Sequence, residues 1–103
     1  MSLDYIVKDD YGQVLKITFI DVDTDAAADI SGYSTTISMI FTDPAGTETT
    51  KTATFDSDGT DGIIKYTVDS SFLATAGNWK VRGQVKSASA TLTTEEEIFY
   101  VRT

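Results

Sequence analysis

The stretch from Gly77 to Lys86, GNWKVRGQVK, alternates strictly between two kinds of side chain. Every odd-numbered position carries glycine or an apolar residue, and every even-numbered position carries a polar or charged one. This period of two is typical of a β-strand with one face against a core. The stretch also holds the only tryptophan of the chain, Trp79, which offers the largest apolar surface. We therefore expect a central strand, with the other strands arranged to cover Trp79.

Alternation of the same kind recurs along the rest of the chain. The other expected strands are Tyr5 to Lys8, Val14 to Asp21, a strand from Thr35 that turns Ile37, Met39 and Phe41 inward, Thr49 to Asp56, a strand that turns Ile64, Tyr66 and Val68 inward, and the segment after Ala90. Turn sequences rich in Gly, Asp, Asn or Pro separate them. Because Thr49 to Asp56 has few large apolar residues, we expect an edge strand there.

About seven short strands, spaced by roughly 8 to 12 residues, predict an immunoglobulin-like antiparallel β-sandwich. Two sheets are favoured over a closed barrel because almost every strand has one apolar and one polar face. A chain of 103 residues has room for one modest core, so residues 1–103 are expected to form a single domain. The absence of cysteine means that antibody-type domains are not implied.

The last two strands are short enough to form a hairpin. A simple antiparallel register would place Arg82 opposite Glu95 and Lys80 opposite Glu97, so that charges match across the strands. The same register would turn Phe99 toward solvent. We therefore predict a β-bulge within Glu95 to Glu97 that returns Phe99 to the core.

The composition restricts the classes of function. A net charge of −8 and a pI near 4.2 oppose binding to nucleic acid and to anionic membranes. Without cysteine or histidine, the chain has neither thiolate or imidazole metal ligands nor a Ser-His or Cys-His nucleophile pair. There is also no Gly-rich phosphate loop. We expect a protein that is not an enzyme and that needs no cofactor.

Two aspartate-rich turns are weak metal candidates. Their members are Asp21, Asp23, Asp25 and Asp29 in the first turn and Asp56, Asp58 and Asp61 in the second. The first turn begins with the ligand spacing of a calcium-binding EF-hand loop. However, Ala26 stands where glycine is needed and Gly32 where a bidentate glutamate is needed. Since aspartate is common in turns for backbone reasons, no metal site is predicted in either.

Tyrosines near loop ends are the candidate binding residues. Tyr11 and Tyr33, and with them Tyr100, are expected at loop ends or at outward positions, and an exposed ring there could stack on a sugar or anchor a protein interface. The competing interpretation is that these rings cap the core, because tyrosine is commonly half buried.

Four stretches in order carry a resemblance to a known family: DYGQVLKITFID, DISGYSTTISMIFTDPAGTETTKTATF, DGIIKYTVDSSFLATAGNWKVRGQV and EEEIFYV. This layout resembles the Ig-like N-terminal domain of phage baseplate upper proteins, over nearly the entire chain. The resemblance implies a structural protein of the virion, made in the bacterial cytoplasm from a phage or prophage gene. Such a module docks to other tail or baseplate proteins, positions a receptor-binding element, and is compatible with an oligomer in the full assembly. The family has no ligand or catalytic motif that assigns roles to residues here.

The alternative is an Ig-like module of a bacterial surface or secreted protein that binds carbohydrate or protein. In that case, the loops with Tyr11 or Tyr33 would contact the carbohydrate.

Overall fold

The computed structural model describes residues 6–21 and 24–103, which form β-strands and no helix. The strands are β1 (Ile6–Val7), β2 (Val14–Thr18), β3 (Ile20–Asp21), β4 (Ala26–Ala27), β5 (Thr36–Thr42), β6 (Glu48–Thr52), β7 (Thr54–Phe55), β8 (Ile63–Thr67), β9 (Gly77–Lys86), β10 (Thr91–Thr93) and β11 (Glu97–Arg102). Nearly all pairings are antiparallel, and the exception is the parallel pair of β1 and β11. The expected all-β class is confirmed.

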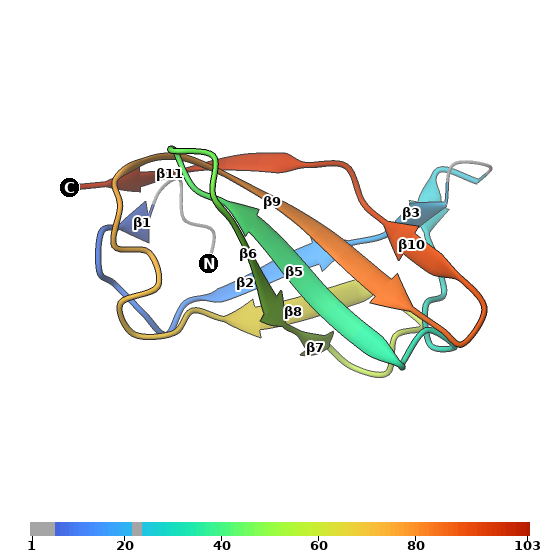
Figure 1. The fold of residues 1–103 in the computed structure, drawn as a ribbon. Helices are drawn as coiled ribbons and strands as arrows, with labels where there is room; N and C mark the ends of the chain where they lie inside the picture. Colours follow the sequence, from blue (N-terminus) through green and yellow to red (C-terminus); the bar gives the residue numbers. More distant parts are fainter. Residues whose placement is uncertain (1–5, 22–23) are drawn as a thin grey trace.

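The strand β9 is the centre of the larger sheet. This sheet has the order β1-β11-β9-β5-β6, and β10 also pairs with β9 (Figure 1). Burial along β9 alternates as the sequence predicts, with Trp79, Val81, Gly83 and Val85 buried. The prediction of a central strand is therefore confirmed.

A three-stranded sheet of order β2-β8-β7 shares one core with the larger sheet (Figure 1). The two sheets approach each other closely at Gly83 of β9. A Cβ atom at this position would lie 3.1 Å from Ile64 Cδ1 and 3.3 Å from Ile17 Cγ2. Glycine here lets the two sheets meet directly. A third pairing, β3 with β4, forms a small ribbon at one end.

The core is centred on aromatic rings. Trp79 is 4% exposed, and its indole N–H donates a hydrogen bond of 2.8 Å to the Thr75 carbonyl. Phe72 packs edge-on against this indole at 5.6 Å, and Phe99 stacks on it at 6.2 Å. The fully buried Phe41 contacts Phe72 and Phe99 in turn. Trp79 is thus buried as predicted, while Phe41 and Phe72 each contact three other rings of the cluster.

Two expected strands are each divided in the structure. The segment from Val14 becomes β2 and β3, because Phe19 between them donates its N–H to Gly62 rather than to a strand partner. The segment from Thr49 becomes β6, at the edge of the larger sheet, and β7, at the edge of the smaller one. The buried Ala53 marks this change of sheet, and its N–H donates to Ile37. The edge position is confirmed, whereas a count of about seven strands was too low.

The first expected strand is described only in part. Ile6 and Val7 form β1, and Tyr5 lies outside the described residues.

The register of the last hairpin changes by one residue, as predicted. Thr93 pairs with Gln84, but Glu97 pairs with Val81. Residues 94–96, which lie between these two pairs, therefore face only two residues of β9, Arg82 and Gly83. Beyond this bulge, Phe99 lies opposite Trp79 on the core side of the sheet.

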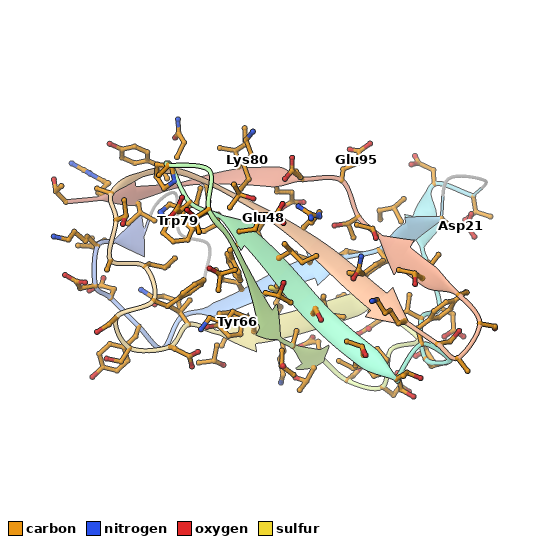
Figure 2. The ribbon with its side chains drawn as sticks, viewed as in Figure 1. Asp21, Glu48, Tyr66, Trp79, Lys80 and Glu95 are labelled. Atoms are coloured by element: carbon orange, nitrogen blue, oxygen red, sulfur yellow. The ribbon has the colours of Figure 1, made fainter. Side chains whose placement is uncertain are left out.

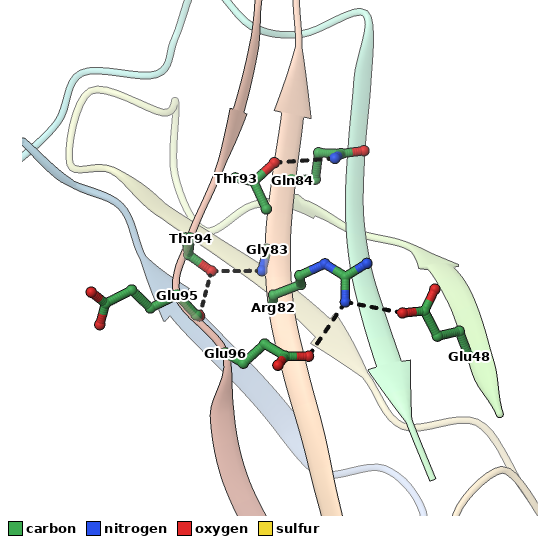
Figure 3. Close-up of polar contacts among 8 residues, drawn as sticks. All are labelled: Glu48, Arg82, Gly83, Gln84, Thr93, Thr94, Glu95 and Glu96. Atoms are coloured by element: carbon green, nitrogen blue, oxygen red, sulfur yellow. Dashed lines mark hydrogen bonds and ion pairs between the residues drawn. The ribbon is translucent and has the colours of Figure 1, made fainter. Parts of the chain in front are cut away.

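Thr94 holds the bulge in place (Figure 3). Its N–H donates to the Gly83 carbonyl at 2.9 Å, and its hydroxyl accepts the Gly83 N–H at 2.8 Å. A side-chain oxygen thus takes the place of a ladder carbonyl, and the N–H of the buried Gly83 stays hydrogen-bonded.

The expected charge pairs were wrong because the bulge shifts the register. Arg82 bonds to Glu96, at 3.4 Å, and to Glu48 of β6, at 3.3 Å (Figure 3). Lys80 lies opposite Ile98 rather than Glu97. Arg82 therefore links β9 to β6 and to the bulge between β10 and β11.

Replacing Thr94 with valine tests the role of this hydroxyl. The shape of the side chain is nearly kept, but the buried Gly83 N–H loses its acceptor, which should cost about 1–3 kcal/mol in the free energy of unfolding. The matched control is Thr93→Val, where the hydroxyl bonds only the exposed Gln84 amide, and we expect a change within about 0.5 kcal/mol. Urea unfolding measures both. Equal effects of the two substitutions would contradict the assignment.

Candidate functional site

A hollow of about 270 Å³ opens beside β8, at the point where β6 of the larger sheet ends and β7 of the smaller sheet begins. Its lining residues are Thr52, Thr54, Lys65, Tyr66, Thr67 and Asp69. The hollow exists because the chain changes sheet at Ala53, so that β7 pairs with β8 only at residues 64 and 65. The rest of β8 on that side borders the opening.

The carboxylate of Asp69 is fixed at the rim of the hollow. Its Oδ2 accepts a hydrogen bond of 2.9 Å from the Tyr66 hydroxyl and lies 3.4 Å from Lys51 Nζ. The Lys51 ammonium in turn sits 4.4 Å from the ring centroid of Phe72, a cation–π contact. These contacts tie β6, β8 and the following loop together across the open side of the core.

The hydroxyl of Tyr66 is a hydrogen-bond donor at neutral pH. Burial, reinforced by the bond to Asp69, raises the pKa of Tyr66 to about 12. In Figure 2, Tyr66 lies near β8, whereas Lys80 and Glu95 lie along the opposite, upper edge of the view. A protonated phenol beside one carboxylate can orient a hydrogen-bonding ligand.

The structure brings the two aspartate-rich turns together at one end. Ile30 N–H donates to the Gly59 carbonyl at 2.8 Å, which joins the turns directly. Asp29 accepts hydrogen bonds from the hydroxyl and N–H of Ser31, and these lower its pKa. Asp58 accepts the same pair from Thr60, with the same effect on its pKa.

The other metal candidates have local partners as well. Asp61 accepts from the Ser57 hydroxyl and the Ile63 N–H, and Asp56 forms an ion pair of 3.2 Å with Lys16. Asp61 therefore serves the geometry of its own turn, whereas Asp56 links the second turn to β2.

In the first turn, the N–H of Asp25 donates to the carbonyl of Asp21, and Asp23 lies outside the described residues. Within residues 6–21 and 24–103, no group of three or more acidic side chains could hold a metal ion.

The two candidate tyrosines lie near opposite ends of β8. Tyr11 is 66% exposed and precedes Gly12, whose N–H donates to Val68. Tyr33 is half-buried against the core and follows Ile30, which bonds the loop before β8. The structure does not bring the two rings together, so each would have to bind alone. Their predicted role in binding stays a prediction.

The sequence did not point to the hollow. Tyr66 was expected only as an inward core residue, and nothing in the sequence singled out Asp69. The one local signal is the three-residue spacing of Tyr66 and Asp69, which brings the hydroxyl and carboxylate within 2.9 Å once β8 ends. The contribution of Lys51 depends on the sheet change and has no sequence signal.

Neither a comparison with protein-family models nor a search of curated proteins finds a match for this chain. None of the described residues belongs to a helix that could cross a membrane.

Replacing Tyr66 with phenylalanine tests the tie to Asp69. At pH 7 we expect a loss of about 1 kcal/mol, because a partly buried hydrogen bond is removed. Because the pKa is higher in the folded state than its ordinary value of 10.0, protonated Tyr66 favours folding below pH 10, and this stabilisation disappears as the pH rises through about 12.

Unfolding in urea between pH 8 and 12 measures this dependence. The wild-type protein should lose more stability over this range than Tyr66→Phe does. Tyr11→Phe, which changes an exposed ring, should follow the wild type. Parallel curves for the wild type and Tyr66→Phe would show that the hydroxyl has no such role.

Proposed function

We propose that this chain is an immunoglobulin-like β-sandwich that serves as a non-enzymatic assembly module of a phage tail or baseplate. The layout of the four sequence stretches supports this reading. The all-β structure, with two larger sheets around one core, is compatible with it. In this role, the domain docks to a neighbouring virion protein and positions a receptor-binding element.

An apolar strip on the outer face of the larger sheet is the main structural support for this role. Ile98 is 67% exposed, Tyr100 48%, and Val7 on the adjacent β1 39%. Ile98 and Tyr100 lie opposite Lys80 and Asn78, which point away from the core. Exposed apolar side chains gathered on neighbouring strands are typical of protein interaction surfaces.

The charge around the strip indicates the kind of partner. The outer face of this sheet carries half of the eight basic residues in a chain of net charge −8, namely Lys80, Arg82, Lys86 and Arg102. Arg82 is already paired with Glu48 and Glu96. A virion protein that presents an apolar patch bordered by acidic groups would complement this face.

The second candidate is the carbohydrate- or protein-binding module of a bacterial surface or secreted protein. The exposed ring of Tyr11 favours it, because such rings stack on sugars. A glycan array separates the two proposals. Saturable binding that is lost in Tyr11→Ala or Tyr33→Ala would favour this second candidate.

Replacing Ile98 with glutamate tests the assembly role. A charge at the most exposed residue of the apolar strip should reduce incorporation of the protein into tail particles at least tenfold. The fold should be kept, because the Ile98 side chain is already exposed. Mass spectrometry of particles purified from a host that carries the gene measures incorporation.

The matched control is Ile20→Glu, an equally drastic change at an exposed isoleucine of β3, outside the strip. It should be incorporated like the wild type. The proposal fails if the wild-type protein is missing from the particles, or if both variants are incorporated normally.

A further inference from the structure

The hollow beside β8 holds more hydrogen-bonding capacity than the protein uses. Thr52, Thr54 and Thr67 are among its lining residues, and none of their hydroxyls bonds to another group in the part of the chain that the structure describes. The ammonium of Lys65 likewise has no ion-pair partner among the described residues. Each hydroxyl is both a donor and an acceptor, and the ammonium supplies further donors.

The carboxylate of Asp69 adds a fixed acceptor. Its Oδ2 is held by Tyr66 and Lys51, whereas its Oδ1 makes no bond to the described protein groups. Because the tie to Tyr66 and Lys51 already orients the carboxylate, a ligand would not have to order it on binding. The hollow thus presents donors and acceptors together, from three segments of the chain.

We propose that this hollow binds a polyhydroxylated ligand the size of one sugar ring. Sugar hydroxyls both donate and accept, which suits a hollow bordered by three threonines, one lysine and one aspartate. A volume of about 270 Å³ is just below the usual range for small-molecule sites, so a single ring fits better than a chain.

This site differs from the tyrosine sites considered above, and the proposal does not rest on the assembly role. Neither Tyr11 nor Tyr33 lines the hollow. The charge of Lys65 distinguishes a sugar acid from a neutral sugar as the ligand. A sugar acid would place its carboxylate against this ammonium, whereas a neutral sugar would use it only as a hydrogen-bond donor.

The test is a titration of the ¹⁵N-labelled full chain, followed by NMR, with methyl glycosides of neutral hexoses and of a uronic acid. We expect saturable shifts of the amides of residues 51–54 and 65–69, with a dissociation constant on the order of 1–10 mM for a ligand of this size. Thr67→Val, which removes one hydroxyl and keeps the shape, should weaken binding roughly fivefold.

The matched control is Thr36→Val, the same change at an exposed position on the outer face of the other sheet, which should leave the affinity unchanged. Loss of uronic acid binding alone in Lys65→Met would identify a sugar acid as the ligand, and loss of all binding would identify a shared donor. Either result supports the site.

Three results would overturn the proposal: no saturable shift up to about 100 mM ligand, well above the expected constant; equal affinity in Thr67→Val and Thr36→Val; or shifts centred on the Tyr11 or Tyr33 segments. Incorporation of Thr67→Val into tail particles is a separate measurement, so the two proposals can fail independently.

Discussion

The direct contact between the inner face of β9 and the strands β2 and β8 is the constraint on which the rest of the structure depends. At Gly83 the two sheets are so close that a methyl group would press on Ile64 and Ile17. On either side of this point, large side chains fill the wider gap, with Phe41 and Trp79 at the centre of the aromatic cluster. A close-packed core of this kind fixes the separation of the sheets and the register of each strand.

The bulge in the last hairpin follows from that constraint. The inner face of β11 must supply Phe99 to the cluster, while β10 must keep Leu92 against the core. These positions are seven residues apart, and an uninterrupted strand would turn one of them outward. One extra residue resolves the conflict, and Thr94 supplies the oxygen that the ladder loses. The same shift gives Arg82 its partner Glu96 and leaves Ile98 and Tyr100 exposed on the outer face.

The edge of the core beside β8 is closed in a different way. Because the chain moves from one sheet to the other at Ala53, neither sheet closes over the end of β8. Tyr66, Asp69 and Lys51 bridge this side with polar contacts instead of apolar packing. The result is a stable edge that still offers unused hydrogen-bonding groups. This combination distinguishes the hollow from the aspartate-rich turns, where the carboxylates with observed contacts accept bonds from their own turns or from Lys16.

The sequence by itself determined the all-β class, the central position of β9, the burial of Trp79 and the bulge near Glu95. Each of these follows from the two-residue period of a strand, which is local and visible in the order of residues. Only the tertiary structure decided which charges pair with Arg82, where the segment after Thr49 changes sheet, and which side chains meet around Asp69. Those outcomes depend on register and on contacts between distant segments, and a local period carries no information about either.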